Sequence, residues 1–200
     1  MAATRALGHP QTLAFVLLFR MLVHHLRAEP APMLEAYDQL ADLCARKGIA
    51  QEILWARAVR GWALFKSGQR EPGLTEVAAG IADQQASHNE LLRPFFLQMH
   101  AELLLESGDV DGADALLHEA RAIGRSTDQQ MFAAEWHRLR GAILEARGQL
   151  DDAQSAYDDA LEVARWQGAR LFEDRARAAL AGLTASRKLD SDRRRRNATA

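Results

Sequence analysis

The sequence predicts an all-α chain in which antiparallel helix pairs stack in line as a solenoid of about nine helices. Two observations lead to this prediction. Small and apolar residues recur at a fixed spacing of forty residues, and glycines and prolines fall between stretches with a helical apolar period. A short helix pair cannot cover its own apolar faces, so pairs of this kind must stack on one another.

The clearest copy of the repeat runs from Glu135 to Arg165. Its marker positions are Gly141, Gly148, Ala153, Tyr157 and Ala160. The corresponding residues are Ala101, Gly108, Ala113, Leu117 and Ala120 one period earlier, and Gly61, Gly68, Gly73, Val77 and Gly80 two periods earlier. The first copy, with Met21, Ala28, Met33, Tyr37 and Leu40, keeps the spacing, but larger residues have replaced most of the small ones.

Turn and capping residues divide each copy into two helices. Pro10 and Pro72 suit the first turn of a helix, where the missing N–H is harmless, and Gly48 and Gly168 suit helix ends. We expect helices over residues 10–27, 33–47, 52–67, 72–87, 89–106, 109–123, 151–167 and 171–183. The first helix of the fourth copy should be capped by Ser126, Thr127 or Asp128.

These elements define one repeat domain over residues 1–186. Its repeats cover about 10–49, 50–88, 89–126 and 127–168, and a terminal helix covers 169–186. Residues 187–200 contain almost no apolar side chains, and we expect a disordered basic tail there. The Arg193–Arg196 run is interpreted as a solubilising tail, with a weak contact to an anionic surface or nucleic acid and a localisation signal as alternatives.

The marker residues Gly141, Gly148, Ala153, Tyr157 and Ala160 resemble the tetratricopeptide signature of G, then G-x4-A, x3-F/Y, x2-A. That resemblance implies a right-handed superhelix of helix pairs. The period is forty rather than about 34, and no proline ends the repeat, so HEAT or armadillo repeats with periods of roughly 40–47 are the alternative.

Longer phrases carry a narrower resemblance. The stretches Leu7–Phe15, Arg60–Leu74, Arg93–Ala113 and Glu135–Leu183 are similar to the C-terminal repeats of bacterial signalling proteins that combine an adenylate or guanylate cyclase with an ATPase module. The resemblance implies a non-catalytic protein–protein interaction module, a scaffold or adaptor in bacterial signalling. The alternative is the detached regulatory repeat region of an adenylate cyclase or of an ATPase-coupled transcriptional regulator.

Residues with recognisable chemistry are missing from the sequence. It contains no G-x4-G-K-[ST] phosphate loop and no H-E-x-x-H, and the adjacent His24 and His25 diverge on a helix. The single cysteine, Cys44, lies on an apolar face and suits a buried position in a reducing cytoplasm. We therefore expect no enzyme activity, no cofactor and no metal.

The charge distribution argues against nucleic acid as a partner. The net charge is −2, although residues 187–196 hold six basic and two acidic side chains, so the repeat body is acidic. The apolar run Leu13–Phe19 is too short for a membrane span and lacks a cleavage site after it. We interpret it as the first helix of the array, and its unprotected apolar face predicts a possible homodimer through the N-terminal helices.

The first helices of the repeats are expected to line a concave groove that holds a protein or peptide. The partner-binding residues that this register predicts are Phe15, Trp55, Trp62, Phe65, Lys66 and Arg138. Aromatic side chains on an exposed face anchor interfaces. The alternative interpretation is that the longer helices turn Trp55, Trp62 and Phe65 inward as ordinary core.

Overall fold

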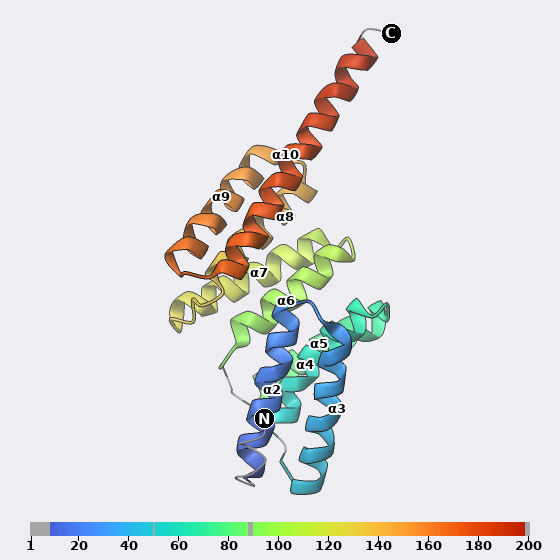
Figure 1. Cartoon of the computed structure of the whole chain (residues 1–200), viewed down its shortest axis with the longest axis vertical. Coiled ribbons are helices and arrows are strands. Elements are labelled where there is room, and N and C mark those ends of the chain that lie inside the picture. Colours follow the sequence, from blue (N-terminus) through green and yellow to red (C-terminus); the bar gives the residue numbers. More distant parts are fainter. Residues whose placement is uncertain (1–8, 50, 88–89, 199–200) are drawn as a thin grey trace. The chain divides into compact units, whose positions relative to one another are not determined.

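Helices make up the whole of the described fold. The computed structural model describes residues 9–49, 51–87 and 90–198, with side chains up to residue 189, and over these residues it contains nine α-helices and no strand (Figure 1). This confirms the predicted all-α fold of antiparallel helix pairs. The helices are α2 (Pro10–Leu26), α3 (Pro30–Lys47), α4 (Gln51–Lys66), α5 (Arg70–Ala86), α6 (Arg93–Glu106), α7 (Val110–Ser126), α8 (Ala133–Ala146), α9 (Leu150–Trp166) and α10 (Arg170–Ala198).

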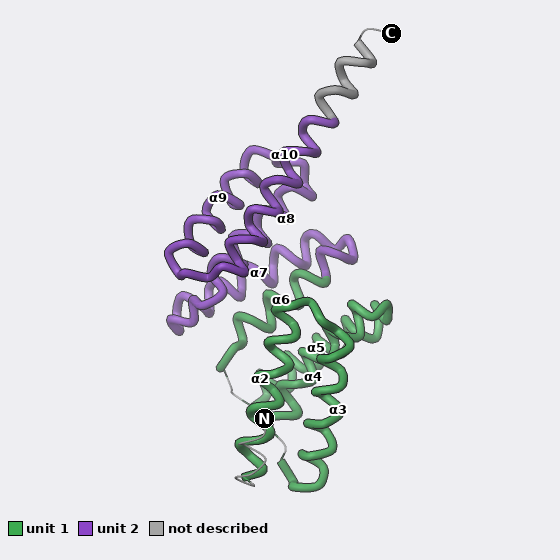
Figure 2. Tube along the Cα trace, in the orientation of Figure 1, with its two compact units in different colours: residues 1–103 green, residues 104–200 purple. Residues whose placement is uncertain are grey.

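The chain divides into two compact units, residues 1–103 and 104–200 (Figure 2). In the first unit α2 packs on α3 and α4, and α4 packs on both α3 and α5. In the second unit α8 packs on α7, α9 and α10, and α9 packs on α10. Each unit therefore shows the nearest-neighbour packing of stacked helix pairs. The right-handed superhelix concerns the whole array and stays a prediction.

Left-handed backbone positions recur every twenty residues. Between the two helices of a pair they are Ala28, Gly68, Gly108 and Gly148, and between pairs they include Gly48, Asp128 and Gly168, with φ values from 55° to 95°. A left-handed residue lets the chain leave a helix sharply, and glycine adopts it without a Cβ clash. The forty-residue repeat is thus visible in the backbone as well as in the sequence.

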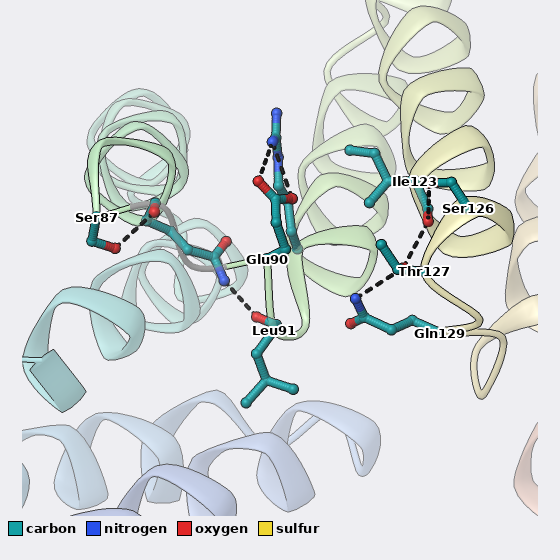
Figure 3. Close-up of polar contacts among 9 residues, drawn as sticks. Ser87, Glu90, Leu91, Ile123, Ser126, Thr127 and Gln129 are labelled. Atoms are coloured by element: carbon teal, nitrogen blue, oxygen red, sulfur yellow. Dashed lines mark hydrogen bonds and ion pairs between the residues drawn. The ribbon is translucent and has the colours of Figure 1, made fainter.

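The connections after α5 and α7 both begin with a hydroxyl side chain that hydrogen-bonds to the last turn of the helix (Figure 3). Ser87 and Thr127, forty residues apart, each follow the last residue of a helix. The Ser87 hydroxyl donates to the carbonyl of Gln84, three residues back, and the Thr127 hydroxyl donates to the carbonyl of Ile123, four residues back, both at 2.7 Å. In the first connection the Arg93 amide donates to the Glu90 carbonyl, and in the second the same bond joins residues 133 and 130.

The two connections correct the predicted starts of the following helices. α6 begins at Arg93 rather than near residue 89, which lies outside the described residues, and α8 begins at Ala133 with Phe132 as its N-cap. Asp128 is left-handed with φ of 56°, and neither it nor Thr127 caps α8. The prediction of a cap at residues 126–128 was wrong, because a left-handed residue and a turn separate those residues from the helix.

The two ends of the array also differ from expectation. α3 begins at Pro30 rather than 33, because proline at the first helical position already has a helical φ. α10 continues to Ala198, so the backbone of residues 187–198 is helical where the sequence predicts a disordered tail. Arginine, lysine and alanine have high helix propensity, which favours continuing a helix that is already formed. The Arg193–Arg196 side chains lie outside the described residues.

The core of each pair is built on the marker positions. Met21, Ala101, Ala113, Ala153, Ala120 and Ala160 have no exposed surface. At Gly73 an added Cβ would lie 2.6 Å from the Phe65 backbone nitrogen and 2.7 Å from the Gly61 carbonyl oxygen. The backbones of α4 and α5 therefore touch directly, and only glycine fits at their contact.

We predict that Gly73→Ala lowers the free energy of unfolding by about 1–3 kcal/mol, because the new methyl group must push the two backbones apart. Gly182→Ala is the matched control. Gly182 is also helical, but nothing lies within 4 Å of the added Cβ, so this change should raise stability by up to about 1 kcal/mol. Urea unfolding of both variants measures the difference, and equal effects would contradict the close contact.

Candidate functional site

Aromatic rings from the first helices of three successive helix pairs meet inside the first unit. His25 of α2 has its ring edge-on to Trp62 of α4 and to Phe95 of α6, with centroid distances of 4.7 and 5.0 Å. All three are at least 95% buried, with exposed fractions of 5%, 3% and 2%. The first helices therefore do converge on one another, but their aromatic side chains pack together and leave little surface for a partner.

The remaining predicted groove residues of this unit are divided between core and surface. Trp55 and Phe65 are buried like Trp62, which favours the interpretation of these aromatics as core. Lys66 is half-buried, with its ammonium group 5.7 Å from the Trp62 ring centroid, where the ring face attracts the cation. Phe15 alone among the aromatic candidates is exposed, at 41%.

Phe15 belongs to an exposed apolar stripe that we call the α2 stripe, formed by Phe15, Phe19 and Val23. Their spacing of four residues puts them on one face of α2, and their exposed fractions are 41%, 44% and 51%. The rings of Phe15 and Phe19 contact each other at 4.9 Å between centroids. The buried face of α2, which includes Ala14, Leu18 and Met21, packs into the unit beside this stripe.

A hollow with a volume of about 300 Å³ lies between α2 and α3. Leu13, Leu17 and Leu43 line its apolar part, and the ion pair of Arg46 with Asp42, at 2.6 Å, lies at its edge. α2 thus has an exposed apolar stripe on one side of its buried face and a shallow hollow on the other.

Arg138, the predicted partner-binding residue of the second unit, is bound within the protein. Its guanidinium group donates to both carboxylate oxygens of Glu135, at 3.0 and 3.1 Å, and Arg175 of α10 donates to the same carboxylate at 2.9 Å. Glu135 is only 2% exposed. Because two cations surround one buried carboxylate, this cluster fastens α10 to α8.

Three arginines surround His137 on the other side of α8. His137, Arg121, Arg125 and Arg140 are close enough to influence one another, and Asp159 is the anion among them, with its carboxylate 3.4 Å from His137 Nδ1. Burial, and after it the charge of Arg121, lowers the pKa of His137, whereas Asp159 raises it. The imidazole is therefore neutral near pH 7. Sequence reasoning missed this cluster, because its members come from different helices.

Two further side chains behave as core groups. Cys44 is buried, as predicted, and burial raises the pKa of its thiol. The Tyr157 ring packs against Gly141, and its hydroxyl donates to Glu145 at 2.8 Å. Burial and that carboxylate raise the pKa of Tyr157.

Among the described residues, no three side chains of the metal-binding types converge, and none of the helices is long and apolar enough to cross a bilayer.

Comparison with known proteins agrees with the fold. A family model described as a tetratricopeptide repeat-like domain matches residues 82–180, from the end of α5 into α10. This match supports a tetratricopeptide-like repeat region rather than a HEAT or armadillo array. Repeats of this class present binding surfaces and are typical of protein–protein interaction modules.

An uncharacterized protein of Rhizobium meliloti (strain 1021) is similar to this chain. The two sequences are 34% identical over 151 residues, which cover 70% of this chain and 14% of the relative. The chain therefore spans about one seventh of the length of that relative, and the similar region belongs there to a much larger protein.

We predict that Glu135→Gln lowers the free energy of unfolding by about 3 kcal/mol, because Arg138 and Arg175 lose a buried carboxylate. Asp151→Asn is the matched control, since Asp151 is 99% exposed and pairs with Arg187 at 2.9 Å. Exposed pairs contribute about 0–1 kcal/mol. Thermal unfolding of both variants measures the change in stability. A loss of stability for Glu135→Gln no larger than that for Asp151→Asn would contradict the stabilising role of the Glu135 carboxylate.

The neutral His137 predicts a pH dependence of stability. A histidine whose folded pKa lies below the unfolded value of 6.5 stabilises the fold above that value, and this stability is lost as the pH falls below it. We expect the wild type to lose more stability between pH 7 and pH 5 than His137→Asn, which cannot titrate. The midpoints of urea unfolding across this pH range measure the loss of stability. Parallel pH profiles of the two proteins would exclude a contribution of His137 to the pH dependence.

Proposed function

We propose that this chain is a non-catalytic protein–protein interaction module that acts as a scaffold or adaptor. The observation that carries the proposal is the α2 stripe, three large apolar side chains exposed in register on one helix face. Exposed apolar patches on repeat proteins are costly in water unless a partner covers them. The tetratricopeptide-like match over residues 82–180 supports the same class of function.

The setting that we propose is bacterial signalling in the cytoplasm. Its support is the resemblance of the stretches Arg60–Leu74, Arg93–Ala113 and Glu135–Leu183 to the repeat regions of cyclase and ATPase signalling proteins. In this role the repeats would recognise a protein or a peptide, and any catalytic step would belong to another domain or protein.

One observation favours a second candidate function. The similar region of the Rhizobium meliloti protein is only 14% of that protein, so a region similar to this chain occurs within a larger protein. This supports a regulatory repeat region that controls attached domains, such as an adenylate cyclase or an ATPase-coupled transcriptional regulator. A cyclase or phosphate-loop domain encoded in the same reading frame would favour this alternative.

The α2 stripe is also where we propose that a homodimer forms. Two copies of α2 related by a twofold axis would bury Phe15, Phe19 and Val23 of each chain against the other. The hydroxyl of serine interacts well with water, so Phe15→Ser with Phe19→Ser should abolish such an interface without entering the core.

We predict that Phe15→Ser/Phe19→Ser removes the binding of a protein partner while leaving the fold intact. The test is affinity capture from the source cells followed by identification of the proteins that the wild type enriches. The matched control is Met131→Ser/Trp166→Ser, which removes two exposed apolar side chains of the second unit, 62% and 86% exposed. Partners that are lost equally with both variants would contradict a role for the stripe.

Light scattering of the same variants separates a homodimer from binding of a different protein. A dimer mass for the wild type and a monomer mass for Phe15→Ser/Phe19→Ser would support self-association. A monomer mass for the wild type at every concentration would exclude the homodimer. The interaction module itself would be excluded if the wild type enriched no protein over a bare affinity matrix.

A further inference from the structure

A hollow of about 290 Å³ lies between α7 and α8 in the second unit. Each helix contributes residues spaced by three and four positions, so one ridge of α7 faces one ridge of α8. Leu117 of α7 and Ile143 and Leu144 of α8 form its apolar part. Its polar lining residues are Asp114, His118, Arg121, Arg140 and Arg147. The hollow thus combines an apolar floor with an excess of cations.

Arg147 is the cation that the protein itself neutralises. Its guanidinium group donates to Asp114 at 2.6 Å and to Asp111 at 2.7 Å. These two carboxylates balance Arg147, and Asp114 is the carboxylate among the residues that line the hollow. Both are therefore already paired with Arg147 and not with Arg121 or Arg140.

Arg121 and Arg140 have no ion pair or hydrogen bond with any other described residue. Arg121 is half-buried, and Arg125 is a further cation beside it, while Asp159 is the nearby anion. Burial, followed by the charges of Arg125 and Arg140, lowers the pKa of Arg121. A guanidinium group held among like charges, away from full hydration, is electrostatically unfavourable. An incoming anion would relieve this repulsion.

We propose that this hollow binds the carboxylate of an acidic side chain from a protein partner, with Arg121 and Arg140 as the anion-binding groups. The inference rests on the proposed interaction function and adds a second contact surface to the α2 stripe. Arginine suits this role because its planar group donates two parallel hydrogen bonds to a carboxylate.

The lining favours a glutamate side chain over a free inorganic anion or a nucleic acid. The methylene groups of glutamate would pack on Leu117, Ile143 and Leu144, whereas a fully hydrated phosphate gains nothing from apolar contacts. A nucleic acid brings many phosphates and is bound by extended clusters of lysine and arginine, whereas the repeat body is acidic overall. One glutamate side chain of an acidic peptide therefore suits the volume of about 290 Å³ and the positive charge of the hollow.

The test uses calorimetric titration of the full chain with a terminally blocked hexaglutamate peptide at low salt. A hexaglutamine peptide and inorganic phosphate are the comparison ligands. The variant is Arg121→Gln/Arg140→Gln, and the matched control is Arg165→Gln/Arg177→Gln, which removes two exposed charges that pair with Glu173. We expect hexaglutamate binding to weaken at least about tenfold in the first variant and to change little in the second.

Stability provides the readout that separates binding from a structural role. Because Arg121 and Arg140 form no ion pair or hydrogen bond with another described residue, Arg121→Gln/Arg140→Gln should unfold at the same temperature as the wild type or a higher one. If this variant nevertheless fails to fold, methyl NMR of the wild type tests whether hexaglutamate binds in the hollow. Hexaglutamate should then shift the signals of Leu117, Ile143 and Leu144, and unchanged signals would overturn the proposal.

Several other results would also overturn it. These are the absence of hexaglutamate binding to the wild type, equal losses in the two double variants, and binding of phosphate or hexaglutamine as tight as that of hexaglutamate. The proposed interaction function is tested separately by affinity capture through the α2 stripe, which does not involve Arg121 or Arg140. A negative result with hexaglutamate therefore leaves that proposal standing.

Discussion

Direct backbone contact between paired helices is the constraint on which this structure depends. At Gly73 and Gly61 the two helices of a pair approach so closely that a methyl group would meet the opposite main chain. At Gly141 the same register position admits the ring of Tyr157 instead. In the pair of α4 and α5 the two backbones are in contact, and in the pair of α8 and α9 a tyrosine ring lies against the glycine. Both arrangements need a residue without a Cβ at the equivalent positions 61 and 141. The left-handed turns every twenty residues then return the chain so that this contact can form again.

The constraint decides where function can be located. In the pair of α4 and α5, glycines fill this contact, so the larger side chains lie on the outer faces of the helices or between neighbouring pairs. In the first unit the aromatic rings of His25, Trp62 and Phe95 fill the space between pairs. The α2 stripe lies on the first described helix, and its three apolar side chains stay exposed on one helix face.

The second unit uses charge where the first uses aromatic packing. One buried carboxylate, Glu135, receives Arg138 and Arg175 and fastens α10 to α8. On the other side of α8 the balance is reversed, because Arg121 and Arg140 outnumber the anions available to them. Excess positive charge in a partly buried hollow adds nothing to the stability of the fold. This is the reason for proposing that Arg121 and Arg140 bind an anionic ligand.

The sequence by itself determined the helical fold, the forty-residue register and the ends of most helices, because these depend on local residue types. Glycine at position 48 stops α3, and Asp109 caps α7, through contacts with residues close in the chain. The tertiary structure alone decided which faces are buried. Trp55, Trp62 and Phe65 occupy groove positions in the register, yet neighbouring helices cover them. The arginine hollow likewise joins residues from α7 and α8, and the packing angle of two helices is set by side chains distant in the sequence.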